Sequence, residues 1–312
     1  AGMYGYRNKM EFSFYTETKE SPIELCFYAR GTHRKVAVKG SELAEPVIND
    51  VATRVVDWLN AEQVNRIDLK TVIIRSNGKG EAIAALFVKK PLSVSAYPEL
   101  DDQLKGFHVY FSDPKSPASV PTELLYSEGV DHLIADINGT ELKFGLLSFF
   151  QVNQPIFQKS LDAIRTFLGD DADVVDFYSG VGSIGLPLAR SSKSVTLVES
   201  NAEANVYARE NVERNGLKNV TVVESVAEKV VDKIVGDKLL VLDPPRAGVH
   251  KNVIGRILEV QPKKIAYLSC NISTQARDVE SLLEVYKIVD ATLYNFFPRT
   301  PHTESLVLLE LK

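Results

Sequence analysis

Side chains that could carry out chemistry lie just after two apolar runs in the last third of the chain. Asp243 directly follows the run at 239–242 and is itself followed by two prolines and Arg246. Cys270 follows the run at 265–268 after a single serine. If the two runs are neighbouring strands of a parallel sheet, their carboxyl ends lie at one edge, where the ligands of such sheets bind. We therefore expect Asp243 and Cys270 to lie close together.

Cys26 and Cys270 are the two cysteines of the chain. A lone cysteine is most often a small buried hydrophobic residue, which fits Cys26 because it lies within a predicted strand. Cys270 instead follows its strand, where turn amides or the start of the next helix could stabilise a thiolate. For Cys270 the sequence alone leaves a buried residue and a nucleophile as equal alternatives. Two cysteines are too few for a four-cysteine zinc site or an iron–sulfur cluster.

Glu304 is a third candidate, because it lies where a turn with two prolines meets the apolar run at 306–311. The alternative is an ordinary surface glutamate. The nearby His302 is more typical of a structural or substrate-contacting residue than of a base. Because no second His or Cys stands at ligand spacing, the sequence predicts no metal site.

A glycine-rich turn follows the apolar run at 174–177 and contains Gly180, Gly182 and Gly185. Glycines at this spacing let the backbone turn tightly and approach a ligand, but the motif also fits a dinucleotide site or a turn without a ligand. Glu199 ends the next predicted strand, where its carboxylate can accept both ribose hydroxyls. Since no basic phosphate clamp follows, S-adenosylmethionine fits at least as well as NAD.

The elements that must position these residues alternate between strand and helix after about residue 154, which predicts a parallel sheet with both faces covered. The predicted strands are 174–177, 194–198, 220–223, 239–242 and 265–268, with helices at 155–168 and 202–215. The part before it is expected to be α+β. Its predicted elements are paired strands at 10–15 and 23–28, a helix at 41–60, and a hairpin of 71–75 and 82–88 around Asn77-Gly78. The prolines at 114, 117 and 121 predict an exposed loop.

Composition is that of an ordinary globular protein, with 45% hydrophobic and 25% charged residues. We expect a cytoplasmic protein, because the start lacks a signal peptide, no run is long enough to cross a membrane, and cysteines are few. Ala1 and Gly2 before Met3 are expected to be a cloning remnant. The net charge of −5 disfavours nonspecific coating of nucleic acid. The first 40 residues nevertheless carry seven basic and four acidic side chains, a local +3 that fits either an RNA surface or a solvated face.

Taken together, the motifs resemble the RNA uracil-C5 methyltransferases, which make 5-methyluridine in transfer and ribosomal RNA. Matching stretches occur in order along nearly the whole chain. They are Tyr6-Arg7-Asn8-Lys9, residues 149–153 (Phe-Phe-Gln-Val-Asn), the turn from Asp176 to Gly185, residues 243–248 (Asp-Pro-Pro-Arg-Ala-Gly), Ser269-Cys270-Asn271 with Arg277-Asp278, and Pro301-His302-Thr303-Glu304. The resemblance implies a Rossmann-like class I methyltransferase domain at 146–312 and an RNA-contacting α+β domain at 1–145.

The resemblance also implies a role for each matching residue. Cys270, as thiolate, would add to carbon 6 of the uracil ring, after which carbon 5 takes the methyl group of S-adenosylmethionine. Glu304 would then remove the carbon-5 proton as general base, and Cys270 would be eliminated. The cofactor positions of the family are matched by Gln151, Tyr178, Gly180, Ser183, Glu199 and Asp243. The substrate positions are matched by Phe149, Arg246, Arg7 and Lys9, with Phe150 as a further aromatic neighbour of an extruded uridine.

The sequence departs from the family pattern in three features. The sequence lacks the four cysteines with which some members hold an iron–sulfur cluster, and no stretch in it corresponds to the upstream RNA-binding barrel that many members carry. Ser183 stands where many relatives have Asn. Two alternative functions remain open, a methyltransferase for another base and a noncatalytic RNA-binding or RNA-folding factor. The sequence indicates RNA, either tRNA or rRNA, as the partner, with no membrane and no obligate protein partner.

Overall fold

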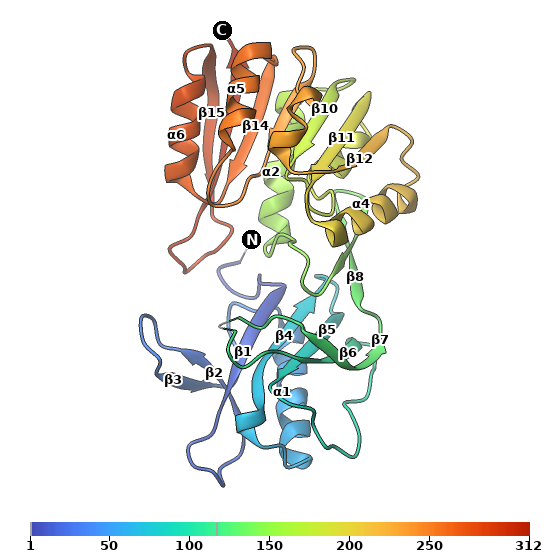
Figure 1. The fold of residues 1–312 in the computed structure, drawn as a ribbon, viewed down its shortest axis with the longest axis vertical. Helices are drawn as coiled ribbons and strands as arrows, with labels where there is room; N and C mark the ends of the chain where they lie inside the picture. The colour runs from blue at the N-terminus through green and yellow to red at the C-terminus, as the bar shows by residue number, and fades with distance from the viewer. Residues whose placement is uncertain (1, 117) are drawn as a thin grey trace. The chain divides into compact units, whose positions relative to one another are not determined.

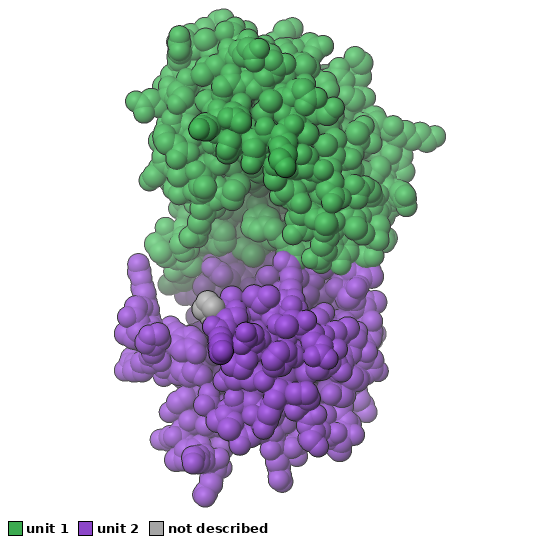
Figure 2. Space-filling view, viewed as in Figure 1, with its two compact units in different colours: residues 1, 136–144, 148–312 green, residues 2–135, 145–147 purple. Residues whose placement is uncertain are grey.

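The computed structural model describes residues 2–116 and 118–312, so Ala1 and Pro117 lie outside the described part of the chain. The chain forms two compact units, which Figure 2 colours separately. We call residues 2–135 and 145–147 the N-terminal unit, and residues 136–144 and 148–312 the C-terminal unit. The sequence placed a single boundary after residue 145, whereas the chain passes between the units after residues 135, 144 and 147.

The N-terminal unit is built on a seven-stranded sheet in the order β3-β2-β1-β4-β5-β6-β7 (Figure 1). All neighbouring strands are antiparallel except β5 and β6. The helix α1 (Pro46–Ala61) packs a buried stripe that includes Val51 and Val55 against β4 and β5. The strands are β1 (Lys9–Tyr15), β2 (Glu24–Tyr28), β3 (Lys35–Val38), β4 (Leu69–Ser76), β5 (Ala82–Val88), β6 (Leu104–Phe111) and β7 (Glu123–Gly129).

The predicted strand pair and hairpin of this unit are confirmed. β1 pairs with β2 and β4 with β5, each antiparallel, and Cys26 in β2 is fully buried as expected. In the hairpin loop, the Asn77 N–H donates to the Glu81 carbonyl at 3.1 Å, and the Asn77 side chain accepts from the Lys79 N–H at 2.9 Å. The polar asparagine thus organises the loop through its own side chain. β3, β6 and β7 were not predicted.

The predicted start of the first helix at Ser41 is wrong. α1 begins at Pro46, whose missing N–H is harmless in the first turn of a helix. Ser41 lies before the helix, where its N–H donates to the Asn49 side chain at 2.9 Å and its carbonyl accepts from the same amide at 3.0 Å. The apolar spacing therefore predicted a helix that is too long at its start. The residues before Pro46 are not helical, and Ser41 among them is hydrogen-bonded to the side chain of Asn49.

After β7 in the sequence, β8 (His132–Ile137) and β9 (Thr140–Gly145) form a two-stranded sheet whose residues are divided between the units. Asn138 and Gly139 at its turn have φ values of 51° and 77°. Consecutive left-handed residues of this kind close a tight hairpin.

The C-terminal unit carries a second seven-stranded sheet in the order β12-β11-β10-β13-β14-β16-β15. The first five strands are parallel, as predicted, and β16 and β15 continue the sheet antiparallel. The strands are β10 (Asp173–Phe177), β11 (Ser194–Glu199), β12 (Val220–Glu224), β13 (Leu239–Leu242), β14 (Lys264–Ser269), β15 (Tyr286–Tyr294) and β16 (Glu304–Leu311). This is the Rossmann-like arrangement that was expected.

Five helices accompany this sheet: α2 (Gln154–Leu168), α3 (Gly185–Ala189), α4 (Ala202–Arg214), α5 (Lys251–Val260) and α6 (Ile272–Leu282). α5 and α6 lie beside each other and bury Val253, Ile257 and Leu282 in a core with Phe177 and Tyr267 of the sheet (Figure 1). β13 and β14 are neighbouring parallel strands, which confirms the expectation that Asp243 and Cys270 share an edge. Among the described residues, no helix combines the length and apolarity needed to cross a bilayer.

Candidate active site

A cavity of about 540 Å³ opens at the carboxyl edge of the C-terminal sheet. Its walls come from the ends of β10, β11, β12, β13 and β14 and from the start of β16. The candidate residues that line it are Phe149, Gln151, Tyr178, Gly180, Glu199, Asp243, Arg246, Cys270 and Glu304. The structure thus brings together residues that lie up to half of the chain apart.

Cys270 and Glu304 reach the cavity from neighbouring antiparallel strands. The last pair in the register of β14 and β16 is Ser269 with Ser305. Cys270 comes directly after Ser269 and Glu304 directly before Ser305, so both residues lie at the end of this register, and both line the cavity. Their neighbourhood therefore follows from strand register, although the two residues are far apart in sequence.

Glu304 is 4% exposed, so it is not an ordinary surface glutamate. Burial raises the pKa of its carboxyl to about 8. The nearby Asp243 carboxylate raises this pKa further, and the positive charge of Arg246 opposes the rise. A carboxyl with a pKa close to neutral can exchange a proton under ordinary conditions, which is what a general base requires.

Cys270 is half-buried, and burial raises the pKa of its thiol, as do the carboxylates of Glu304 and Asp243. Arg246 opposes this rise through a hydrogen bond to the thiol and through its charge. The expectation that turn amides would stabilise the thiolate is therefore wrong. α6 begins at Ile272 with Asn271 as its cap, and the Asn271 N–H donates to the Ser269 hydroxyl at 3.1 Å.

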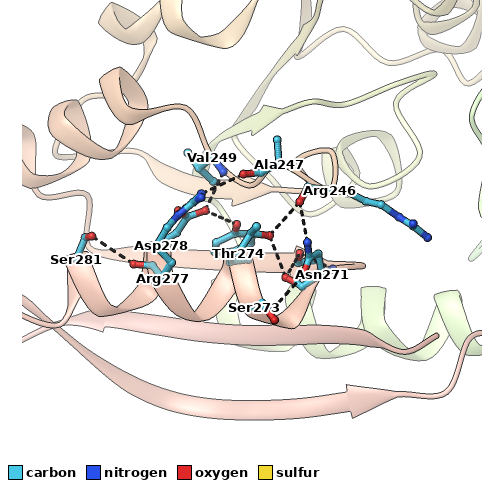
Figure 3. Close-up of polar contacts among 11 residues, drawn as sticks. Arg246, Ala247, Val249, Asn271, Ser273, Thr274, Arg277, Asp278 and Ser281 are labelled. Atoms are coloured by element: carbon cyan, nitrogen blue, oxygen red, sulfur yellow. Dashed lines mark hydrogen bonds and ion pairs between the residues drawn. The ribbon is translucent and has the colours of Figure 1, made fainter. Parts of the chain in front are cut away.

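Arg246 is positioned by its backbone. The side chains of Asn271, the cap of α6, and of Thr274 in its first turn donate to the Arg246 carbonyl at 2.9 and 3.2 Å. From this attachment its side chain extends away from α6 (Figure 3). The guanidinium is the positive charge that affects the pKa of both Cys270 and Glu304. Asp243, at the start of the same loop, has a pKa raised to about 7 by burial.

The glycine-rich turn is organised by two carboxylates. Asp176 accepts the Gly185 N–H at 2.8 Å beneath the turn, and Glu199 accepts the Gly180 N–H at 2.9 Å at the cavity wall. Tyr178 has a φ of 65°, a conformation that L-residues seldom adopt away from functional turns. The turn is thus held in a strained shape with the Tyr178 side chain and the Glu199 carboxylate facing the cavity.

Four residues with expected roles lie elsewhere. Ser183 is buried and does not belong to the cavity lining. Phe150 is buried and stacks on Phe144 with 4.1 Å between ring centroids, so its proposed neighbourhood with an extruded base is wrong. Arg7 and Lys9 belong to the N-terminal unit, where burial followed by the charge of Arg75 lowers the pKa of Lys9 to about 8.

The segment after β12 lines the cavity but was missed from the sequence. Val226, Ala227 and Glu228 form part of the wall next to Glu199. The signal was available, because these residues follow a predicted strand at the same sheet edge. Within the described chain, no three His, Cys, Asp or Glu side chains are grouped so that they could hold a metal ion.

The cavity has a size and lining that suit a nucleoside-type cofactor. A volume of about 540 Å³ falls within the roughly 300–1,000 Å³ of small-molecule sites. The apolar wall of Val198, Val226 and Ala227 can hold a flat ring, and Glu199 presents a carboxylate beside it for hydroxyl groups. The cavity therefore offers room for an adenosine group near Glu199 and for a reacting base near Cys270.

Comparison with known proteins gives a consistent result. The model of the tRNA (uracil-5-)-methyltransferase family matches residues 3–312. A protein of Prochlorococcus marinus named as an uncharacterized RNA methyltransferase is 30% identical over 98% of this chain and 78% of its own length. One of Fusobacterium nucleatum, named likewise, is 26% identical over 99% of this chain and 71% of its own length.

Among solved structures, the tRNA (uracil-54, C5)-methyltransferase of Pyrococcus abyssi in complex with S-adenosyl-L-homocysteine has a TM-score of 0.86 at 23% identity. The match covers 99% of this chain and 76% of that one. Trm5b of the same organism has a TM-score of 0.54 at 16% identity over 74% of this chain and 73% of its own. At these identities the likeness establishes the shared fold.

Proposed function

This chain belongs to the tRNA (uracil-5-)-methyltransferase family, a family of S-adenosylmethionine-dependent RNA methyltransferases. We propose that it methylates carbon 5 of a uridine by covalent catalysis, with Cys270 as the nucleophile and Glu304 as the general base. The observation that carries this proposal is that Cys270, directly after β14, and Glu304, at the start of β16, line one cavity with Arg246 and Asp243. Carbon 5 and carbon 6 are neighbouring ring atoms, so a nucleophile and a base must act close together.

The chain supplies the nucleophile first. Cys270, as thiolate, forms a bond from sulfur to carbon 6, and the electrons of the carbon 5–carbon 6 double bond move toward the carbon-4 oxygen. Arg246 favours this step, because its charge stabilises the thiolate from which the attack starts. S-adenosylmethionine supplies the methyl group that carbon 5 acquires.

Glu304 completes the reaction. Its carboxylate accepts the proton of carbon 5, the electrons of that bond restore the ring double bond, and the sulfur–carbon bond to Cys270 breaks. The base must be ionised to act, and a pKa of about 8 leaves a usable fraction in that form near neutral pH. The product is 5-methyluridine, and the free thiolate is regenerated.

Cofactor binding is assigned to the other end of the cavity. Glu199 holds the ribose hydroxyls, Tyr178 and Gly180 flank the nucleoside, and Gln151 and Asp243 face the reacting end. This assignment is supported by the cavity lining, which includes all five residues, several of them at the ends of β10, β11 and β13. Ser183 remains a proposed contact only through the family motif.

The proposed substrate is a uridine in tRNA or rRNA that leaves its stack to enter the cavity. Phe149 is 71% exposed at the cavity wall, where its ring can stack on the base, and Arg246 contacts the same base. Arg7 and Lys9 are proposed to contact RNA from the N-terminal unit. We expect the protein to act in the cytoplasm.

The direct test measures methyl transfer from radiolabelled S-adenosylmethionine to unmodified tRNA and rRNA, followed by nucleoside analysis. Label in 5-methyluridine that disappears with Cys270→Ala supports both the product and the nucleophile. Label in a methylated cytosine or adenine would contradict the uridine assignment. Binding of cofactor and RNA without any transfer, in wild-type protein, would favour the noncatalytic alternative.

A further inference from the structure

The loop that carries Arg246 is fastened to α6 through its backbone. This loop, residues 243–250, connects β13 to α5. Arg246 itself receives two hydrogen bonds at its carbonyl, from Asn271 at 2.9 Å and Thr274 at 3.2 Å (Figure 3). Its carbonyl is therefore fixed while its side chain is left to face the cavity.

Asp278 is the centre of a second set of contacts with the same loop. Its side chain is 4% exposed, and one carboxylate oxygen accepts both the Val249 N–H and the Tyr267 hydroxyl at 2.8 Å. The other oxygen accepts from Arg277 at 2.7 Å, and Arg277 also donates to the Ala247 carbonyl at 3.0 Å. A buried carboxylate with this many donors fixes their positions, because any loss leaves a buried charge unsatisfied.

Gly248 shows how closely the loop approaches α6. Its φ is +84°, and a Cβ at this position would lie 2.6 Å from both Arg277 Nη2 and Asp278 Oδ2. No side chain can be accommodated there without displacing the ion pair. The loop and the Arg277–Asp278 pair therefore form one packed unit.

The same helix also contacts the strand ends that carry the nucleophile and the base. Gln275 donates to the Tyr267 carbonyl at 2.8 Å and to the Ser305 carbonyl at 3.1 Å. Ser305 directly follows Glu304, and Cys270 lies two residues before the first turn of α6. α6 is thus the common support of the elements that carry Arg246, Cys270 and Glu304.

We propose that Asp278 is a positioning residue, which holds the loop of Arg246 on α6 and so keeps the Arg246 guanidinium against Cys270 and Glu304. The proposal rests on the assigned roles of Cys270 and Glu304, but its direct consequence is the reactivity of the Cys270 thiol. Three charged groups face that thiol, namely Arg246, Glu304 and Asp243. Of these three groups, Arg246 alone favours the thiolate. If the loop that carries Arg246 moves away from Cys270, the two carboxylates that remain near the thiol both disfavour its ionisation.

The test is the rate of alkylation of Cys270 by iodoacetamide as a function of pH, which needs neither cofactor nor RNA. Cys26 is fully buried, so the fast reaction reports Cys270, and Cys270→Ala gives the background. Asp278→Asn keeps the shape of the side chain but turns an amide N–H toward Arg277. We expect the apparent thiol pKa to rise by about half a unit and alkylation near neutral pH to slow about threefold.

A double-mutant cycle separates positioning from general loss of structure. Arg246→Met should shift the alkylation profile in the same direction, and Asp278→Asn should add nothing in the Arg246→Met background. Glu280→Gln, an exposed change on the same helix, is the matched control and should leave the profile unchanged. An equal shift from Asp278→Asn in both backgrounds would overturn the proposal.

Thr274→Val provides a milder variant if Asp278→Asn does not fold. It removes one of the two hydrogen bonds to the Arg246 carbonyl and leaves Asp278 intact. The expected shift is smaller, in the same direction, and absent in the Arg246→Met background. An unchanged profile for every folded variant of Asp278 and Thr274, with wild-type circular dichroism, would show that the contacts stabilise the fold without positioning Arg246. Normal alkylation behaviour with no methyl transfer would instead count against the proposed function.

Discussion

Cys270 directly follows Ser269, and Glu304 directly precedes Ser305, where Ser269 and Ser305 are the last pair in the antiparallel register of β14 and β16. The side chains of Cys270 and Glu304 both line the same cavity, which the proposed attack on carbon 6 and proton removal from carbon 5 require. Because β16 runs antiparallel to β14, its first residue, Glu304, lies at the edge where the parallel strands end. A parallel strand at this position would have its last residue at that edge.

The first prediction concerns Glu304→Gln. An amide cannot accept the carbon-5 proton, so the bond between Cys270 and carbon 6 should form but not break. We expect turnover to fall by about 10²-fold or more and a covalent protein–RNA adduct to accumulate. Denaturing gel electrophoresis with labelled RNA and S-adenosylmethionine measures the adduct. The double variant Glu304→Gln with Cys270→Ala is the control, and an adduct that survives in it would exclude Cys270 as the attachment point.

The second prediction is a rate that rises with pH. Glu304 must lose its proton to act, and its pKa of about 8 lies far above the ordinary value of 4.5. The raised thiol pKa of Cys270 works in the same direction. The kcat/KM for RNA, which reports groups of the free enzyme, should increase from about pH 6 to pH 8 and keep rising above pH 8, because the thiol of Cys270 must also ionise and its pKa is raised above the ordinary value of 9.0. A kcat/KM that falls between pH 6 and pH 8 would show that the protonated form of Glu304 is the active one, which contradicts its role as base.

The same raised pKa predicts how stability depends on pH. Folding favours the protonated form of Glu304, so its contribution to stability is fully present below 4.5 and is lost as pH rises through about 8. Glu304→Gln never ionises, and it should make the protein more stable than wild type above pH 8 by a few kcal/mol, on the order of 2–4. Urea unfolding of both proteins at acidic and alkaline pH measures the difference. An equal effect at both pH values would point to altered packing instead.

Cofactor binding gives a prediction with an internal control. Glu199 and Glu224 are paired in the register of β11 and β12, but only Glu199 belongs to the cavity lining. Glu199→Gln should weaken binding of S-adenosylhomocysteine about tenfold, because a charged acceptor of the ribose hydroxyls is lost. Glu224→Gln should leave the affinity unchanged within about twofold. Isothermal titration calorimetry distinguishes the two, and equal losses would remove Glu199 from the proposed ribose contact.

Much of the C-terminal unit could be predicted because its strands are continuous apolar runs that end in polar residues. β13 and β14 end at Asp243 and Cys270, and parallel strands necessarily present such ends at one edge. β15 could not be predicted in this way, since most of its residues are exposed and it lacks an apolar run. The position of Glu304 depended on the register of β16, which the sequence does not specify.

Electrostatics was the part that sequence reasoning predicted least well. The thiol of Cys270 follows a strand and precedes a helix, a position that suggests stabilised charge. In the structure its neighbours are the carboxylates of Glu304 and Asp243 and a single opposing charge, Arg246. A side chain is buried by elements that are distant from it in the sequence. The raised pKa values of Cys270 and Glu304 therefore could not be inferred from local motifs.

The last prediction separates two adjacent aromatic residues. Phe149 is 71% exposed at the cavity wall, whereas Phe150 is 3% exposed and stacks on Phe144. Phe149→Ala should reduce kcat/KM for RNA by a factor that corresponds to about 1–3 kcal/mol of stacking, with cofactor affinity unchanged. Phe149→Tyr should retain most of the activity. Phe150→Ala should instead lower the free energy of unfolding by about 3–5 kcal/mol, because it leaves a cavity in the core. Steady-state kinetics with RNA and urea unfolding of each variant test both statements. A Phe149→Ala protein that is unstable but kinetically normal when folded would remove this residue from the substrate site.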